Sequence, residues 1–501
     1  MSRLSRNLRT HVRRAAWKTV VFAGWAGTLV GCSVGPNYKR PAVSTPASYR
    51  GGLSPDIAAT SEATGITPLG AEKYPGVFTD PVLQSLIAEA LKNNFDVRIA
   101  ADRVLEEQAQ LGITRAAQYP SVTAGGSYDA VSLPGGLLNG VGNNGSSNSN
   151  SNNNAHTNIY SGGFSASAAW NLDFWGLYRR QTEAARAELL ASEWAKQTTY
   201  STVVATVATD YYQLRTLDSQ LAITQATLEA RKQSLDLTHK LEQGGATSLA
   251  DVRQAEELYY TAQAEIPDLQ RQIEQLENNL SLLLGRNPGS IIRNASTPAD
   301  SIATAPHPTD VPVGLPSELL ERRPDIRRAE ELLVQANANI GVAKAQFFPQ
   351  LSLSATAGTA SSQLKGLVDS KNFYYYAIGT ATQTVFDAGK LRNNYRLSKA
   401  KQDELLVTYQ QTIAGAFRDV SNALIAYNKT REYREQQEKQ TAASADAVRL
   451  ARLRYNGGST SYLEVLTTDA TLYSSQLTLE SVRQQEALAL VQLYNALGGG
   501  W

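Results

Sequence analysis

The sequence has little that could carry catalysis or bind a metal. Its single cysteine, Cys32, excludes a disulfide within the chain. None of the four histidines, His11, His156, His239 and His307, has a cysteine or a second histidine at the spacing of a metal site. There is also no glycine-rich phosphate loop and no nucleophile-elbow pattern. These absences predict a protein that is not an enzyme and that holds neither a metal nor a cofactor.

The sequence also lacks an excess of one charge and lacks long apolar runs. The 47 lysine and arginine residues balance 46 acidic residues, so the sequence predicts no nucleic-acid-binding surface. After Cys32 no apolar run reaches the length of about 18 residues that is expected of a membrane-spanning helix. Glutamine, asparagine, serine, threonine and alanine are abundant instead, which favours long solvated helices and polar-faced strands over one compact core.

Residues 1–31 have the features of a secretory signal peptide. Basic residues and no acid occur in positions 1–18, and a short apolar run follows at 19–30. The run ends in Leu29-Val30-Gly31-Cys32, which resembles the bacterial lipobox, where the cysteine is acylated and the peptide is cut just before it. An ordinary signal peptide with a stray cysteine is the alternative, but the place of Cys32 at the cut site favours a lipid anchor. The residue after it is Ser33 and not the aspartate of inner-membrane lipoproteins, which resembles the outer-membrane pattern.

The rest of the chain contains an internal repeat. Residues 94–98 match 323–327 at an offset of 229, and residues 244–248 match 457–461 at an offset of 213. The offset changes across a tract of Asn, Ser and Gly at 143–158, which predicts that the first half carries a longer solvated loop there.

Each half predicts the same order of elements, namely a helix, two strands, a very long helix and a shorter helix. An extended segment at 32–80 precedes the first half, and a linker at 289–315 separates the two. In the first half, 81–288, the predicted bounds are 96–117, 119–131, 159–174, 176–242 and 247–285. In the second half, 316–498, they are 325–346, 349–361, 373–387, 389–455 and 460–497.

The periodicities indicate where these elements lie. Apolar residues from Phe164 to Phe174 alternate with polar ones, which is typical of membrane β-barrel strands, although a soluble sandwich would alternate too. Aromatic residues at 373–376 suit an interfacial girdle. In the long helices apolar residues recur every seven positions, from Val207 to Leu235 and from Leu406 to Tyr427, which predicts coiled-coil packing. Four strands cannot close a barrel, and open strand edges are too costly in lipid, so several chains must pool their strands.

In order along the chain, six motifs resemble those of the TolC-like outer membrane factors, in the lipoprotein efflux subfamily of NodT/OprM type. They are the segments 31–38, 172–176, 320–326, 347–351, 386–389 and 455–458. The resemblance implies a mixed α and β membrane protein, a trimeric twelve-stranded β-barrel continued by a twelve-helix periplasmic α-barrel, with two structural repeats per chain. It implies the passive exit duct of a tripartite efflux pump in the outer membrane of a Gram-negative bacterium. The implied partners are outer membrane lipid, a periplasmic adaptor and an inner-membrane transporter of the RND type.

The resemblance also assigns site residues. The helix-hairpin tips that contact the adaptor would be Gly244, Gly245, Gly457 and Gly458, and the tunnel would be closed near them. The candidates for this gate are Glu464, Leu463, Thr467, Asp251, Tyr455 and Thr460.

Two of these candidates depart from the family pattern. Thr467 replaces a second acid, and Thr460 stands where some members have an arginine, which predicts fewer charged contacts in the closed gate. Asp251 and Tyr455 match positions that link neighbouring hairpins in some members. For Glu464 the alternative is a solvated acid favoured by a helix N-terminus.

Two other functions remain open from the sequence alone. A type I protein-secretion channel would have the same shape, and a periplasmic coiled-coil scaffold without a pore would share the helices. The sequence does not identify the transported substrate, the cognate pump, the state of the gate or any role for the loop at 143–158.

Overall fold

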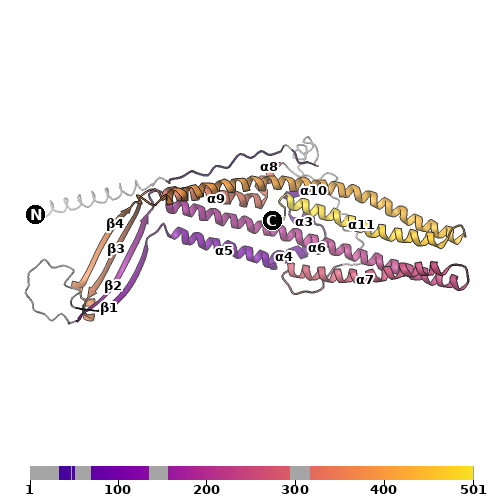
Figure 1. The fold of residues 1–501 in the computed structure, drawn as a ribbon, viewed down its shortest axis with the longest axis horizontal. Helices are drawn as coiled ribbons and strands as arrows, with labels where there is room; N and C mark the ends of the chain where they lie inside the picture. The colour runs from indigo at the N-terminus through magenta and orange to yellow at the C-terminus, as the bar shows by residue number, and fades with distance from the viewer. Residues whose placement is uncertain (1–32, 47, 51–68, 135–155, 294–315, 500–501) are drawn as a thin grey trace, which may run out of the picture. The chain divides into compact units, whose positions relative to one another are not determined.

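The computed structural model describes residues 33–46, 48–50, 69–134, 156–293 and 316–499 (Figure 1). The predicted signal peptide, Cys32 and residues 143–155 of the predicted loop lie outside the described residues. Residues 156–158 of that loop are the start of a strand, which extends the strand beyond its predicted bounds.

A four-stranded antiparallel sheet lies in the order β1-β2-β3-β4 (Figure 1). Its strands are β1 (Ser121–Pro134), β2 (His156–Leu172), β3 (Gln350–Ser361) and β4 (Phe373–Thr382). Each half of the sequence thus contributes one hairpin, and β2 pairs with β3 to join the two hairpins. The outer edges of β1 and β4 are without a partner strand in the described chain.

The strand register separates two faces of the sheet, because successive side chains point to opposite sides. The polar face carries Ser121, Thr123, Ser127, Asp129, Ser161, Ser165, Ser167, Asn171, Ser352, Ser354, Thr356, Thr380 and Thr382, together with Val131, Ala169, Ala360, Tyr374, Tyr376 and Ile378. The apolar face carries Val122, Ala124, Tyr128, Ala130, Tyr160, Phe164, Ala166, Ala168, Trp170, Leu172, Leu351, Leu353, Ala355, Ala357, Phe373, Tyr375, Ala377 and Ala381, together with Ser132, Thr359 and Ser361. Large apolar side chains on this second face, such as Phe164 at 63% and Tyr375 at 80%, are exposed in the single chain.

The strand predicted at 373–387 is too long. β4 ends at Thr382 because its partner β3 begins at Gln350, which is paired with Thr382. Asp387, beyond the strand, accepts hydrogen bonds from the backbone N–H groups of Gly389 and Leu391 at 2.9 and 2.7 Å. These bonds lower the pKa of the Asp387 carboxyl, and they make this residue the start of the next helix rather than the end of a strand.

The helices of the two halves have matching lengths. The pairs are α5 (Phe95–Ala116) and α9 (Pro324–Ala345) with 22 residues each, α6 (Leu177–Gln243) and α10 (Lys390–Asn456) with 67, and α7 (Leu249–Leu283) and α11 (Tyr462–Ala496) with 35. Shorter helices are α3 (Tyr74–Val77), α4 (Pro81–Asn93) and α8 (Pro316–Arg322). Within the described ranges, no helix combines the length and apolarity needed to cross a bilayer.

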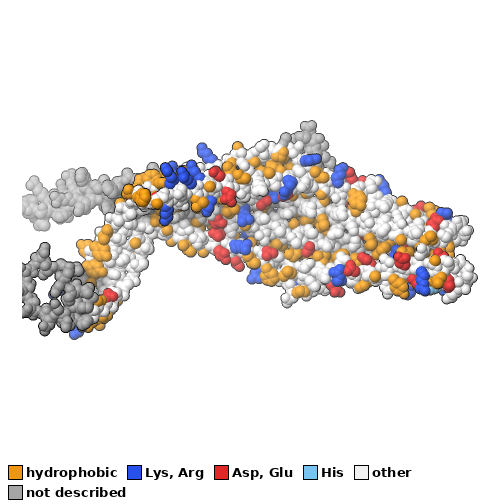
Figure 2. Space-filling model, in the orientation of Figure 1, with side chains coloured by type: hydrophobic (Ala, Val, Ile, Leu, Met, Phe, Trp, Pro, Cys, Tyr) orange, Lys and Arg blue, Asp and Glu red, His pale blue; other side chains and the backbone are white. Residues whose placement is uncertain are grey.

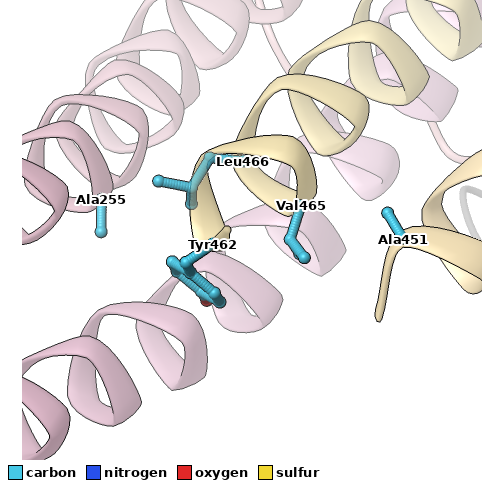
Figure 3. Close-up of a cluster of buried hydrophobic side chains, with 5 residues drawn as sticks. All are labelled: Ala255, Ala451, Tyr462, Val465 and Leu466. Carbon is cyan, nitrogen blue, oxygen red and sulfur yellow. The ribbon is translucent and has the colours of Figure 1, made fainter. Parts of the chain in front are cut away.

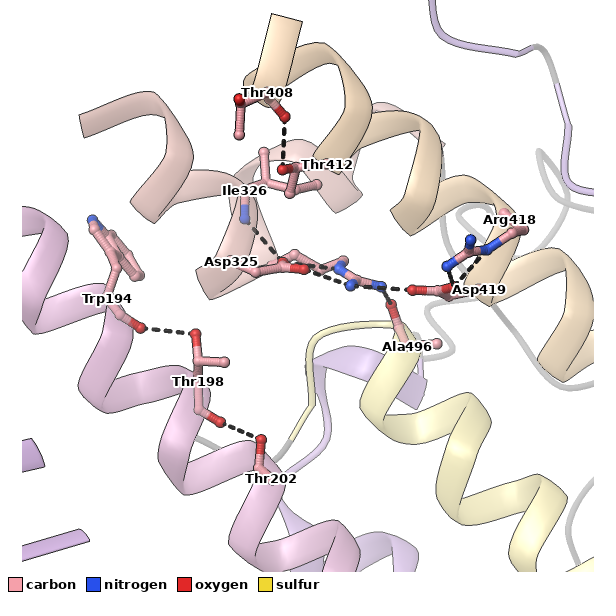
Figure 4. Close-up of polar contacts among 11 residues, drawn as sticks. Trp194, Thr198, Thr202, Asp325, Ile326, Thr408, Thr412, Arg418, Asp419 and Ala496 are labelled. Carbon is pink, nitrogen blue, oxygen red and sulfur yellow. Dashed lines mark hydrogen bonds and ion pairs between the residues drawn. The ribbon is translucent and has the colours of Figure 1, made fainter. Parts of the chain in front are cut away.

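Residues 198–209 of α6 are helical although they are rich in threonine and valine, which are poor helix formers. The hydroxyls of Thr198, Thr202 and Thr206 each donate to the carbonyl four residues earlier, at 2.8 to 3.0 Å. Figure 4 shows the first two of these bonds along one face of the helix. The polar groups are therefore satisfied within the helix. Nearby heptad positions, Val207 and Leu214, are fully buried.

The chain divides into two compact units. One contains the sheet and residues 33–39 of the N-terminal segment. In this unit the N–H of Val34 donates to the carbonyl of Trp175 at 3.0 Å, and Arg180 donates to the Asn37 side chain at 2.7 Å. The predicted extended segment at 32–80 is only partly extended, because Leu69–Ala71 and α3 form short helical turns.

The other unit contains the C-terminal helix and both helix hairpins. Its core includes Phe78 and Tyr494, whose rings meet edge to face at 5.6 Å. Arg323 donates to Asp325 at 2.6 Å and to the carbonyl of Ala496 at 3.1 Å, and it lies 3.5 Å from Asp419. Asp325, Asp419 and Ala496 converge from three helices in Figure 4. The motif at 320–326 therefore joins α9, α10 and the end of α11. On the face seen in Figure 2, charged side chains are scattered among uncharged ones over the helices.

Candidate functional site

Two helix hairpins end in turns of the same geometry, at Gly244-Gly245 and at Gly457-Gly458. Gly245 and Gly458 have φ values of 72° and 71°, in the left-handed region. The residue after each donates back to a carbonyl five residues earlier, at 2.8 Å for Ala246 and 2.9 Å for Ser459. This is the helix C-cap that glycine favours, and it lets each chain reverse directly into the next helix. Among the described residues, no atom beyond the two chain neighbours would lie within 4 Å of a Cβ at Gly245 or Gly458, so the rest of the described chain does not cover either tip.

Asp251 caps the first turn of α7. Its carboxylate accepts from the hydroxyls of Thr247 and Ser248 at 2.7 and 2.8 Å and from the N–H of Ser248 at 3.1 Å, while the Ser248 hydroxyl accepts from the Asp251 N–H. These hydrogen bonds lower the pKa of the carboxyl. That Asp251 and Tyr455 link neighbouring hairpins stays a prediction. Within the described chain, the hydrogen bonds of Asp251 are made with Thr247 and Ser248, at the start of its own helix.

Glu464 lies in the first turn of α11 and has a basic partner that the sequence analysis missed. Arg454, in the last turn of α10, donates to one oxygen of the Glu464 carboxylate at 2.6 Å. The hydroxyl of Thr460 donates to the other oxygen. Glu464 is thus paired with an arginine from across the turn, although position 460 is a threonine. A basic residue in the last turn before a Gly-Gly tip was the available signal.

The other gate candidates of α11 differ in exposure. Leu463 is 43% exposed. Thr467 is also exposed, but its hydroxyl donates to the carbonyls of Leu463 and Glu464 at 3.0 and 3.1 Å. The Thr467 hydroxyl therefore offers no free hydrogen-bond donor to that surface.

An apolar cluster above the tips joins the two hairpins. It consists of Ala255 from α7, Ala451 from α10, and Tyr462, Val465 and Leu466 from α11 (Figure 3). The Tyr455 and Tyr462 rings pack at 4.9 Å, and the Tyr462 hydroxyl bonds to Ser234 of α6. Burial, together with Tyr462 and Asp251 nearby, raises the pKa of Tyr455. Tyr455 is thus placed beside the cluster within its own chain.

Arg231 of α6 is the buried polar link between the hairpins. Its side chain is 4% exposed, donates to Asp469 of α11 at 3.1 Å and to the carbonyl of Leu258 of α7 at 2.9 Å, and lies 4.9 Å above the Tyr473 ring. A cavity of about 240 Å³ adjoins it, lined also by Ser234, Tyr462 and Asp469. Arg452 of α10 lines the cavity too, so four helices meet at this point.

The turns, the apolar cluster and the contacts of Arg231 hold the ends of the helices together. Among the residues that the structure describes, no group of three or more His, Cys, Asp or Glu side chains is placed to hold a metal ion.

Comparisons with known proteins give one family. The model of a family described as outer membrane efflux protein matches residues 86–286 and 315–499. The chain is 34% identical over 480 residues to the probable efflux pump outer membrane protein TtgC of Pseudomonas putida, covering 94% of this chain and 93% of that protein. It is 33% identical over 473 residues to the cation efflux system protein CusC of Escherichia coli, covering 94% and 96%.

Solved structures agree with this relationship. The MtrE outer membrane channel of Neisseria gonorrhoeae, in its open state, superposes with a TM-score of 0.79 at 29% identity, over 94% of this chain and 98% of that one. These matches confirm the resemblance that the six motifs predicted.

Proposed function

Because the chain belongs to the outer membrane efflux protein family, we propose that it is the outer-membrane exit duct of a tripartite efflux pump. It would passively conduct small molecules from a periplasmic adaptor and an inner-membrane transporter, of the RND type, to the outside. The observation that carries this proposal is the combination of an open-edged, two-faced sheet with two long helix hairpins that end in exposed glycine turns.

The sheet supports a trimer. Its apolar face suits lipid and its polar face suits water, but the edges of β1 and β4 would leave unpaired backbone groups in a bilayer. Pairing β4 of one copy with β1 of the next removes every edge. Three copies then give a twelve-stranded barrel, wide enough for a channel, whereas the interior of an eight-stranded barrel is filled by side chains.

The hairpins support a gate at the periplasmic end and a docking site for the adaptor at the tips. Three copies of Glu464 around an axis would attract cations and repel anions. Arg454 offsets part of that charge, so the ion pair sets how much of it the pore experiences. Cys32 would anchor the mature chain to the membrane by its lipid.

We propose drugs or other toxic small compounds as the substrates. The relatives do not narrow this further. Their names specify toluene, antibiotics and cations at nearly equal identity, between 33% and 34%.

Deletion of the protein, followed by a broad susceptibility panel, tests the proposal. The deletion strain should become sensitive to several unrelated compounds, and the intact chain should restore resistance.

In the deletion strain that expresses the chain with a photo-cross-linker at Gly245 or Gly458, the cross-linker should capture a periplasmic adaptor. The same cross-linker at the exposed Val407 of α10 serves as control. Unchanged susceptibility with loss of a secreted protein would instead indicate a type I secretion channel. A protein that forms no heat-modifiable trimer in outer membranes would indicate a scaffold without a pore.

A further inference from the structure

The four described strands contain one charged side chain, Asp129 of β1, whose carboxylate is exposed. Every other strand residue is apolar, hydroxylated, amide-bearing, glycine or, at the start of β2, histidine. A charge on a membrane strand is costly on the lipid side and tolerated on the water side. Its position on the sheet therefore decides what it can do.

The register places Asp129 on the polar face. Asp129 pairs with Ser161 of β2, and its neighbours on the same side of β1 include Ser127. Ser127 and Val131 flank it on the same side of β1, and no other charged side chain lies on this face of the described strands. Asp129 forms no ion pair with any other residue that the structure describes.

Asp129 also lies far from the helices. β1 begins at Ser121, directly after the α5 segment, and Asp129 is eight residues further along. At about 3.3 Å per residue this is roughly 26 Å along the strand, close to the height of the apolar band of a membrane barrel. The residue is therefore near the turn end of the sheet, at the opposite end from the strand-to-helix junctions.

We propose that Asp129 is a selectivity-determining residue, which forms a ring of three carboxylates at the outer mouth of the pore and favours the passage of cations. This inference rests on the proposed trimeric channel. It assigns a charged ring on the strands, distinct from the proposed ring of Glu464 at the hairpin tips, and Asp129 is the one charged residue of the four described strands.

Among the described residues at this end of the sheet, the other charged side chains belong to the turn between β3 and β4. Lys365, Asp369 and Lys371 lie there, on short helical turns outside the strands. Asp369 is committed to capping, since it accepts from the N–H of Lys371 at 3.1 Å. These groups surround the mouth, whereas Asp129 stands on the pore wall itself.

The test is the reversal potential of the purified full-length protein in planar bilayers under a KCl gradient. Asp129→Asn should lower the ratio of cation to anion permeability by roughly two- to fivefold, and Asp129→Lys should invert the preference. The effect should be larger near 0.01 M than near 0.1 M salt, because the Debye length grows from about 10 to about 30 Å. Asp369→Asn, which removes an acid from the turn and not from the strands, should change the ratio much less.

The second measurement compares a blocking ion added to one side of the bilayer with the same ion added to the other side. Lanthanum chloride added on the barrel side should block the native channel at lower concentration than the Asp129→Asn channel, and addition on the hairpin side should not distinguish them. An unchanged reversal potential in both Asp129 variants would overturn the inference while leaving the channel itself intact. If the native protein forms no conducting channel at all, the proposed function fails instead.

Discussion

Arg454 and Glu464 form an ion pair across the Gly457-Gly458 turn, with 2.6 Å between Nη1 and Oε1. The Arg454 side chain is 57% exposed and that of Glu464 is 34% exposed, so solvent screens the pair and its contribution to stability is below about 1 kcal/mol. The pair can still affect the passage of ions, because both charges lie beside the proposed gate.

The two partners should therefore act in opposite directions. Glu464→Ala should raise single-channel conductance or reduce cation preference, because it removes a carboxylate from the constriction. Arg454→Gln should increase cation preference, because it leaves that carboxylate uncompensated. Both are measured in planar bilayers, with thermal unfolding as the control for stability. Identical conductance and selectivity in the native protein and both variants would remove Glu464 from the gate.

The buried pair of Arg231 and Asp469 should behave differently in stability measurements. Arg231→Ala leaves the Asp469 side chain, 17% exposed, without its main partner, so we expect a loss of about 3 kcal/mol in the free energy of unfolding. Arg452, 3.8 Å from Asp469, limits the loss.

Lys429→Ala provides the matched control. Lys429 pairs with Glu432 on the surface, where both side chains are more than 60% exposed, so its removal should cost less than about 1 kcal/mol. Thermal unfolding followed by helical circular dichroism measures both variants. Equal losses would show that burial does not decide the strength of the Arg231 link.

The sequence predicts features made by neighbouring residues better than contacts between residues that lie far apart along the chain. The heptads and the repeat predicted the long helices to within two residues at each end, because helix periodicity and the Gly-Gly turns are local signals. Arg231 and Asp469 are 238 positions apart, and nothing in the pattern of either helix marks them as partners.

The same difference between local and distant signals applies to the residues of the proposed gate. The glycine tips follow from local spacing, whereas the pairing of Glu464 depends on how the turn brings α10 against α11. The strand was predicted to run to residue 387, but its pairing with β3 ends at Thr382, and the end of the partner strand is not a local signal. The family pattern concerns position 460, whereas the basic partner of Glu464 in the structure is Arg454, on the other side of the turn.

Asp251 should give a pH-dependent contribution to stability. Hydrogen bonds from Thr247 and Ser248 lower its pKa from the usual 3.8, so the carboxylate is more stable in the folded chain than in the unfolded one. The contribution is therefore complete above about pH 4 and is lost as the pH falls through the lower, folded value. Asp251→Ala should cost about 1 kcal/mol at pH 7 and less near pH 3, where the native cap is itself weakened. Asp446 is an exposed acid within α10, and Asp446→Ala should cost less stability at both pH 7 and pH 3. A loss of stability at position 251 that does not depend on pH would contradict the capping role.

Cys32 should be the site of acylation. Cys32→Ser should abolish incorporation of a radioactive fatty acid, because the sequence has no other cysteine. The label is followed by autoradiography of the immunoprecipitated chain, with the native protein in parallel. A labelled Cys32→Ser chain would place the lipid elsewhere.

The two glycines of each tip should differ in what they tolerate. Gly458 has a φ of 71°, where a Cβ costs about 1 kcal/mol, whereas Gly457 continues the helical hydrogen bonds by donating to Leu453 at 3.0 Å. Gly458→Ala should therefore destabilise the protein by about 1 kcal/mol, and Gly457→Ala should be neutral or slightly stabilising, because alanine restricts the unfolded chain. The Gly245→Ala and Gly244→Ala pair should repeat this difference, since Gly245 has a φ of 72°. Thermal unfolding of the four variants measures it, and equal effects within each pair would mean that the left-handed turn is not what requires glycine at the tips.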